Sequence, residues 1–182
     1  MYRLFIPTGV ALAALLGGAA AVTHTAPRPA GRDTIPPALS PFGMEHEALL
    51  VKFDAVLQRA VAPAATRAER EQFVDYLRTA VIPHAQMEER VLYPALESVL
   101  GTQGYATATM VLDHRAIARL TVELAALADP EAFRRKALAV AALVEHHFAK
   151  EEDFVLPNLA RKMSDRELRA LLARMDAERI AP

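Results

Sequence analysis

The stretch HAQMEE, residues 84–89, decides the fold together with its echo HFAKEE, residues 147–152. In both stretches a histidine precedes a Glu-Glu pair by four residues, and a proline, Pro94 or Pro157, stands ten residues after the histidine. Residues four apart on an α-helix lie one above the other, so the histidine and the first glutamate point to the same place. The repeat predicts two helical hairpins, each of which supplies half of one polar site.

Apolar residues recur at helical spacing from Ser40 onward, and no stretch alternates as a strand would. The expected helix starts are Ser40-Pro41, the capping box of residues 66–69, residues 102–107, Asp129-Pro130-Glu131 and the capping box of residues 164–167. The second helix is expected to bend at Pro83 and to end near Pro94 or Gly101, and the fourth to end before Pro157. Long amphipathic helices joined by short loops predict an all-α fold, an antiparallel up-down-up-down four-helix bundle with a short C-terminal fifth helix.

Several polar residues lie on the apolar stripes of these helices, where apolar side chains are expected. Each long helix has one inward histidine, and two helices add a glutamate one turn later, which gives the set His46, His84, Glu88, His114, His147 and Glu151. No Lys or Arg shares these faces. An unpaired buried carboxylate costs several kcal/mol, a penalty that bound cations would remove. The pattern therefore predicts a metal site with room for two ions, and the alternative hypothesis is a set of unrelated core histidines.

With these motifs the chain resembles the hemerythrin HHE cation-binding family over about Pro41 to Leu159. The resemblance implies an antiparallel four-helix bundle with a non-haem di-iron centre that binds oxygen or a related small molecule. By position, the nitrogen ligands would be the four inward histidines, and the bridging carboxylates would be Glu88 and Glu151. Two iron ions with an oxo or hydroxo bridge are the expected cofactor, although imidazole and carboxylate also suit manganese and zinc.

The chain departs from the oxygen-carrying hemerythrins at two places. Those proteins have a further histidine one turn from the third-helix ligand, where this chain has Met110 and Ala118. They also carry the fourth-helix carboxylate one residue later than Glu151. The chain follows a variant with four histidines and two glutamates, which argues against oxygen transport but leaves the metal site intact.

Composition excludes several classes of protein. Among the 182 residues there is no cysteine, so disulfides, thiolate metal sites and cysteine nucleophiles are ruled out. The formal net charge is −1 with acids and bases interspersed, so no basic face indicates a nucleic-acid partner. Any metal must be held by histidine and carboxylate.

The first forty residues do not resemble the rest of the chain. Leu4 to Val22 carry no charge and follow Arg3, as in a signal peptide or an N-terminal membrane anchor. Residues 1–25 are therefore expected to be an apolar leader or anchor helix, and residues 26–40 a Pro-rich linker. The hemerythrin-like domain would then cover 41–160 and the C-terminal helix 161–182. We expect export to, or tethering in, the cell envelope, while cleavage stays open and a buried helix of the domain is the alternative.

The neighbours of the candidate ligands are expected to lie outside the site. Glu45, Glu47, Glu89 and Glu152 should face outward or pair with basic side chains, and Asp113 should be solvated. His146 points about a quarter turn from His147 and is expected at the edge of the bundle, with substitution as a ligand as the alternative.

Four functions fit this sequence. The first is a module that binds or senses oxygen or a related molecule such as nitric oxide or peroxide. The second is a di-iron oxidoreductase acting on peroxide or oxygen, and the third is iron storage or buffering. The fourth is a metal-free helical interaction protein. The sequence indicates neither the protein partner nor the oligomeric state.

Overall fold

The computed structural model describes residues 37–180, with side chains up to residue 178. Within this range the chain forms helices and short connections and contains no strand, which confirms the predicted all-helical class. The predicted leader (residues 1–25) and most of the linker (26–40) lie outside the described residues. In the part described, no helix is both long enough and apolar enough to cross a membrane.

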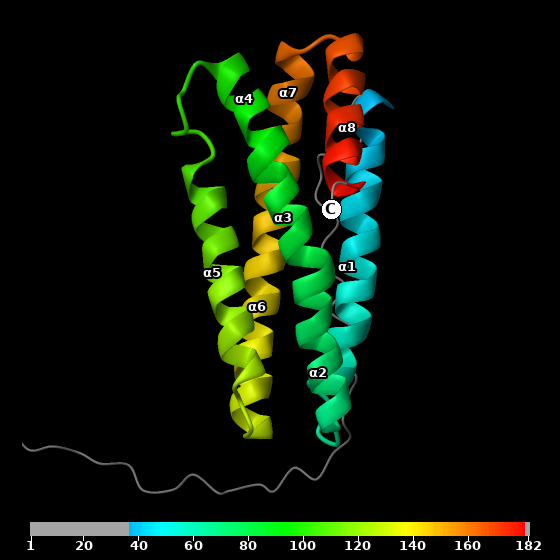
Figure 1. The fold of residues 1–182 in the computed structure, drawn as a ribbon, viewed down its shortest axis with the longest axis vertical. Helices are drawn as coiled ribbons and strands as arrows, with labels where there is room; N and C mark the ends of the chain where they lie inside the picture. Colours follow the sequence, from blue (N-terminus) through cyan, green and yellow to red (C-terminus); the bar gives the residue numbers. More distant parts are fainter. Residues whose placement is uncertain (1–36, 181–182) are drawn as a thin grey trace, which may run out of the picture.

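The helices join into four long segments and one shorter one. In chain order they are η2 (Pro37–Leu39), α1 (Ser40–Ala60), α2 (Arg67–Tyr76), η3 (Leu77–Val81), α3 (Ile82–Met87), η4 (Glu88–Leu92), α4 (Tyr93–Leu100), α5 (Ala108–Ala125), α6 (Pro130–Lys150), η5 (Glu151–Val155), α7 (Leu156–Lys162) and α8 (Asp165–Ile180). Figure 1 shows α1, the α2–α4 segment, α5 and the α6–α7 segment side by side, with successive segments running in opposite directions. Contacts join α1 to α2, α2 to α5, α5 to α6 and α6 to α1, so the four segments surround a common interior.

Capping side chains set several helix starts, as the sequence predicts. Thr66 and Glu69 form a reciprocal capping box at α2, Asp129 accepts a hydrogen bond from the Ala132 amide at α6, and Ser164 pairs with Glu167 at α8. Each of these contacts satisfies amides that the first helical turn leaves unpaired. α1 begins at Ser40 as expected, but its preceding residue makes no side-chain cap.

Three prolines lie inside the long segments rather than at their ends. Pro83, Pro94 and Pro157 each stand two residues after a five-residue π-helical turn, namely η3, η4 and η5. Proline cannot donate to the carbonyl four residues earlier and its ring crowds that carbonyl, and a widened turn relieves both problems. The expected ending before Pro157 is therefore wrong, because the fourth segment continues to Lys162. The second segment passes Pro94 and ends at Leu100, where Gly101 adopts φ 70°.

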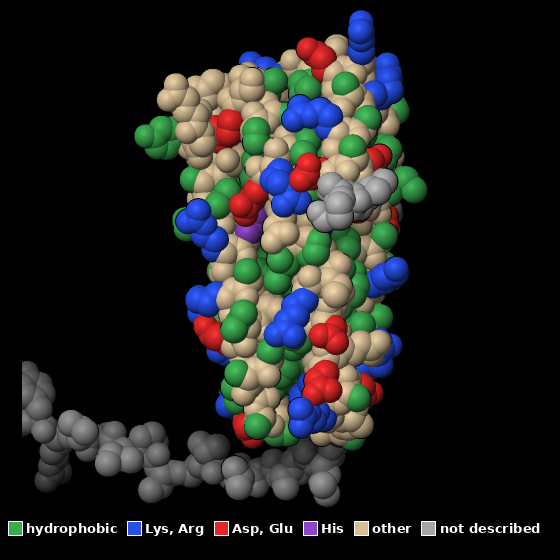
Figure 2. Space-filling model, viewed as in Figure 1, with side chains coloured by type: hydrophobic (Ala, Val, Ile, Leu, Met, Phe, Trp, Pro, Cys, Tyr) green, Lys and Arg blue, Asp and Glu red, His purple; other side chains and the backbone are tan. Residues whose placement is uncertain are grey.

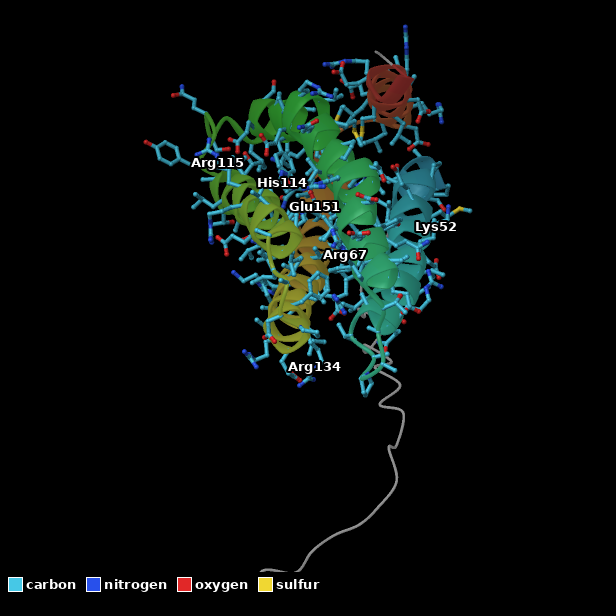
Figure 3. The ribbon with its side chains drawn as sticks, turned by 60° about the horizontal axis from the view of Figure 1, so that its bottom comes forward. Lys52, Arg67, His114, Arg115, Arg134 and Glu151 are labelled. Carbon is cyan, nitrogen blue, oxygen red and sulfur yellow. The ribbon has the colours of Figure 1, made fainter. Side chains whose placement is uncertain are left out.

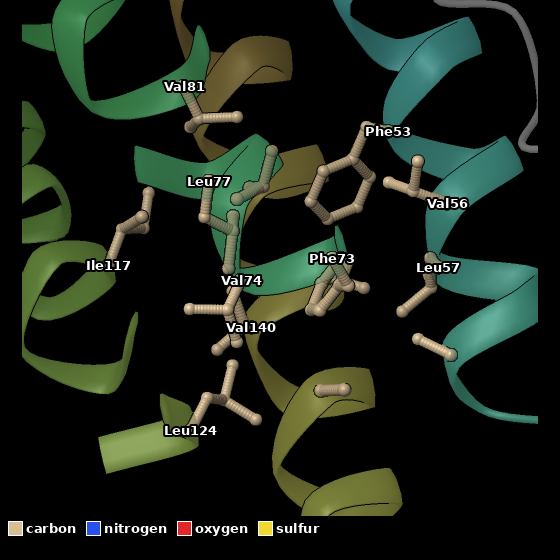
Figure 4. Close-up of a cluster of buried hydrophobic side chains, with 14 of the residues drawn as sticks. Phe53, Val56, Leu57, Phe73, Val74, Leu77, Val81, Ile117, Leu124 and Val140 are labelled. Carbon is tan, nitrogen blue, oxygen red and sulfur yellow. The ribbon is translucent and has the colours of Figure 1, made fainter. Parts of the chain in front are cut away.

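The apolar core consists of two clusters. The lower cluster (Figure 4) comprises Phe53, Val56, Leu57, Ala60, Phe73, Val74, Leu77, Val81, Ile117, Leu124, Phe133, Ala137, Val140, Ala141 and Val144. The upper cluster comprises Leu39, Phe42, Met87, Val91, Leu92, Tyr93, Leu96, Met110, Val155, Leu156, Leu159, Leu168, Leu171 and Met175. The predicted inward histidine of every long segment lies between a residue of one cluster and a residue of the other. The core is thus two dry layers with one polar layer between them.

Helix α8 completes the upper cluster. Its residues Leu168, Leu171 and Met175 are almost fully buried, and the helix contacts η2, α3 and η4. This apolar face matches the stripe that the sequence predicts for the fifth helix. The outer surface carries interspersed Lys, Arg, Asp and Glu, and the face in Figure 2 has no continuous basic patch.

Phe73→Ala is expected to destabilise the protein by about 3–5 kcal/mol, because Phe73 is fully buried between Phe53 and Phe133 and its loss leaves a cavity. Val51→Ala, at a position that is 65% exposed, should change stability by less than about 0.5 kcal/mol. Urea unfolding followed by circular dichroism measures both. Equal effects of the two substitutions would contradict the assignment of the lower cluster.

Candidate metal centre

The six predicted site residues meet in the polar layer. His46, Glu88 and Glu151 have no exposed surface, and the other three histidines are at most 6% exposed. Figure 3 shows His114 and Glu151 within the body of the protein, whereas Lys52 and Arg134 lie at its periphery. The sequence therefore predicted correctly that two glutamates and four histidines share the interior. His146 is exposed and stands apart from them.

The potential donor atoms form two overlapping groups. His46, His84 and Glu88 make one group, and Glu88, His114, His147 and Glu151 make the other, with the donor atoms of each group within 4.8 Å of one another. Glu88 belongs to both groups. A carboxylate has two oxygens, so one glutamate can serve two adjacent cations. The geometry therefore offers two neighbouring cation positions joined by Glu88.

All four histidines turn Nε2 toward the centre of the layer. His84 Nε2 lies 2.8 Å from Glu88 Oε1, and His46 Nε2 lies 3.4 Å from the same oxygen. In the other group, the Nε2 atoms of His114 and His147 are 2.8 Å apart. His147 Nε2 lies 3.5 Å from Glu151 Oε2, and His46 Nε2 lies 3.6 Å from it.

The backbone places both glutamates at the same local feature. Glu88 is the first residue of η4 and Glu151 is the first residue of η5. Each glutamate is thus one α-helical turn after its histidine and at the start of a widened turn. Such single π turns frequently occur at functional sites. The sequence echo therefore extends to the backbone conformation.

Burial and mutual repulsion make the layer electrostatically uneven. Burial, together with the neighbouring Glu88, raises the pKa of Glu151 to about 7. Burial disfavours the charge of Glu88 too, but the histidines around it, above all His84, outweigh burial and hold the pKa of Glu88 well below its usual value. Burial likewise lowers the pKa of His84, yet Glu88 and Glu45 outweigh it and raise that pKa to about 10. Without bound metal, the layer therefore holds the charged pair of His84 and Glu88, and beside it the carboxyl group of Glu151, which resists ionisation.

Several buried polar atoms of the layer lack a hydrogen bond within the described part of the chain. They include Glu88 Oε2, Glu151 Oε2 and His84 Nε2, all of which belong to the two donor groups. Among residues 37–178 no Lys or Arg is buried, so no buried Lys or Arg compensates the carboxylates. Imidazole nitrogens and carboxylate oxygens without other partners are the donors that transition-metal cations take in proteins. The residues present therefore fit bound metal ions.

Two phenylalanines exclude water from the first donor group. The ring of Phe148 stacks on that of His46 with centroids 4.4 Å apart, and Phe42 packs against His46 at 4.3 Å. Both phenylalanines are almost fully buried. They hold the imidazole in place and lower the local dielectric constant, which strengthens any charge interaction in the layer.

Tyr93 is a site residue that the sequence analysis did not identify. It is the first residue of α4 and is 2% exposed, and its hydroxyl donates a hydrogen bond of 2.6 Å to Glu151 Oε1. The same hydroxyl lies 3.2 Å from His114 Nε2. Tyr93 stands five residues after Glu88, a spacing that places it off the His84–Glu88 line on a regular helix, and η4 lies between the two residues. The sequence analysis missed Tyr93 because the sequence did not indicate the widened turn η4.

Four acidic residues also lie closer to the site than expected. Glu152 is buried rather than outward-facing, and Glu45, Glu89 and Asp113 each contact a site histidine. The expectation of a solvated Asp113 is wrong as well, since its side chain is 18% exposed and it also pairs with Lys150.

Comparison with known protein families shows which family the chain belongs to. The model of the hemerythrin HHE cation-binding domain matches residues 42–159. The chain belongs to the hemerythrin HHE cation-binding family. Comparisons with curated proteins and with solved structures gave no match. The matched range covers all six residues of the polar layer, so family membership and geometry both indicate metal binding by this hemerythrin-like domain.

In the metal-free hemerythrin-like protein, Glu151→Gln is expected to raise stability strongly at pH 8 and much less at pH 5. The pKa of Glu151 is about 7 when folded and near its ordinary 4.5 when unfolded. This group's contribution to stability therefore falls as the pH rises from 4.5 through 7. A neutral glutamine removes a penalty of roughly 3 kcal/mol at pH 8. Urea unfolding after chelator treatment measures the change in the free energy of unfolding, and the exposed Asp153→Asn is the control. If Glu151→Gln gave no gain in stability at pH 8, the raised pKa of the buried Glu151 would be contradicted.

Proposed function

We propose that this chain is an antiparallel up-down-up-down four-helix bundle that holds two iron ions and binds or senses oxygen or a related small molecule such as nitric oxide or peroxide. The observation that carries the proposal is the pair of buried donor groups that share Glu88. One ion would be held by His46, His84 and Glu88. The other would be held by His114, His147, Glu151 and the shared Glu88.

Iron is proposed from the family and from the chemistry of the donors. Hemerythrin HHE domains bind cations, and a nitrogen and oxygen donor set suits iron, while the same set accepts manganese or zinc. A bound iron pair supplies coordination positions for a diatomic molecule or peroxide. The protein contributes the dry surroundings, because Phe42 and Phe148 pack against the imidazoles.

Access to the layer is suited to small molecules. A pocket of about 270 Å³ lies between α1 and α8 and is lined by Phe42, Glu45, Leu172 and Met175 among others. Phe42 and Glu45 both contact site histidines, so the pocket ends directly outside the first donor group. A pocket of this size accommodates diatomic molecules or peroxide beside Phe42 and Glu45, and it is smaller than the clefts that typically bind drug-sized ligands.

An oxidoreductase that acts on peroxide or oxygen is the second candidate, and Tyr93 favours it. Reduction of oxygen or peroxide needs protons, and the Tyr93 hydroxyl is a buried proton-bearing group within the polar layer. Burial and the nearby carboxylates raise the pKa of Tyr93, so the phenol keeps its proton in the metal-free protein.

The sequence alone supports a further proposal, that residues 4–22 direct the chain to the cell envelope. Fractionation of cells that express the full chain would test this proposal.

The purified protein is expected to contain two iron ions per chain, and Glu88→Gln is expected to lose most of them because the shared carboxylate is neutralised. Metal analysis after expression with added iron measures the content. Asp153→Asn, which removes an exposed carboxylate one residue beyond Glu152, should keep the iron. In the iron-loaded, reduced protein, oxygen or nitric oxide should produce a visible absorption band that Glu88→Gln lacks. Equal, negligible metal in all three proteins would refute the proposed metal site.

Tyr93→Phe distinguishes the two candidate functions. If the protein turns over peroxide, we expect the turnover rate of this variant to be at least about tenfold lower than that of wild type, with the same iron content. The reason is that a positioned proton donor contributes roughly 10²–10⁴-fold to a rate. If the protein only binds small molecules, Tyr93→Phe should leave the absorption band of the bound molecule in place and wild-type turnover should not exceed that of free iron. Peroxide consumption and optical titration of both proteins provide the measurement.

A further inference from the structure

Each of the four site histidines has a carboxylate on the side that faces away from the centre. Glu45 Oε1 lies 3.1 Å from His84 Nδ1, and Glu89 Oε1 lies 2.8 Å from His114 Nδ1. The other two contacts are longer: Asp113 Oδ2 lies 3.4 Å from His147 Nδ1, and Glu152 Oε1 lies 3.8 Å from His46 Nδ1. The first two are hydrogen bonds, and the last two are close charge contacts. No histidine of the layer is left out.

These contacts close a ring around the protein. Each outer carboxylate is the chain neighbour of a candidate ligand and serves the histidine of the next segment. Glu45 of α1 contacts the second segment, Glu89 of η4 contacts α5, Asp113 of α5 contacts α6, and Glu152 of η5 contacts α1 again. The same four contacts therefore tie all four segments together at the level of the polar layer. We call Glu45, Glu89, Asp113 and Glu152 the carboxylate ring.

At His84 and His114 the ring favours the tautomer that leaves Nε2 facing the centre without a proton. A carboxylate that accepts a hydrogen bond from Nδ1 keeps the proton on that nitrogen and leaves Nε2 as the free donor for a metal. All four Nε2 atoms do point inward. The same contact shifts electron density onto the imidazole and makes it a stronger donor. His84 and His114 have such a hydrogen bond at Nδ1, whereas Nδ1 of His46 and Nδ1 of His147 have only the longer charge contact.

The ring also adds carboxyl groups around the layer. Its members bring four carboxyl groups in addition to Glu88 and Glu151, and Asp113 pairs with Lys150. Negative charge close to a metal centre in a dry environment stabilises the more highly charged oxidation state. Both effects of the ring, stronger donors and added charge, have the same direction.

We infer that the carboxylate ring lowers the reduction potential of the metal centre and makes the diferric state the stable resting state. The inference rests on the proposed function, because it requires that the two ions are iron. The ring residues are positioning residues, since they act through the imidazoles and do not reach the inner donor groups. A centre with this bias stays oxidised at potentials where a reversible oxygen carrier must remain ferrous.

Charge-removing substitutions that keep the shape of the side chain test the inference. Glu89→Gln and Glu45→Gln alter the two shortest ring contacts, one in each donor group, at side chains that are 38% and 23% exposed. Asp153→Asn is the matched control, because Asp153 adjoins Glu152 in the sequence but is exposed. Each protein is loaded with ferrous iron, its iron content is measured, and its midpoint potential is determined by spectroelectrochemistry.

We expect Glu89→Gln to keep two irons per chain and to shift the midpoint potential to a more positive value than Asp153→Asn does. The double variant Glu45→Gln with Glu89→Gln should shift it further, and dithionite should reduce the double variant faster than wild type. Equal potentials in iron-loaded wild-type, ring and control proteins would overturn the inference.

Loss of iron from Glu89→Gln with unchanged helicity would also overturn it, because the ring would then serve metal affinity rather than potential. If wild-type protein takes up no iron, the proposed function itself fails, and this outcome differs from iron-loaded proteins of equal potential.

Discussion

Two glutamates with no exposed surface, Glu88 and Glu151, lie between two apolar clusters, and the rest of the structure depends on how their charge is tolerated. Burial alone would drive both carboxyl groups to the neutral form. Instead, the histidines around Glu88 stabilise its charge while Glu151 resists ionisation. Bound metal cations would offset the charge that these two carboxyl groups bring into the layer.

The π turns and the two apolar clusters together bring the donors to one level of the fold. Both glutamates begin π turns that accommodate a proline two residues after the turn, so the segments pass through the layer without breaking. The apolar clusters above and below hold the four segments at a fixed spacing. Because protein cores are close-packed, the two clusters limit how far the imidazoles can move.

Each site imidazole has one ring nitrogen facing the centre of the layer and the other facing outward. Their Nε2 atoms face the candidate cation positions, and their Nδ1 atoms face carboxylates from neighbouring segments, so that one ring of contacts both positions the donors and joins the helices. This arrangement explains why acidic residues adjoin ligand positions: Glu45 precedes His46 and Glu89 follows Glu88. A substitution in the carboxylate ring therefore changes both the charge around the site and a contact between two helical segments.

The sequence by itself determined the helical class, the caps at Thr66, Asp129 and Ser164, and the inward positions of the histidines and glutamates. These features depend on spacing along one helix, where the geometry is fixed at 3.6 residues per turn. Only the tertiary structure decided the place of Tyr93, which follows from a widened turn, and the carboxylate ring, whose members sit one residue from a ligand and so point away from it on their own helix. They reach a histidine only because the neighbouring segment packs at that level, and such contacts between segments leave no periodic trace in the chain.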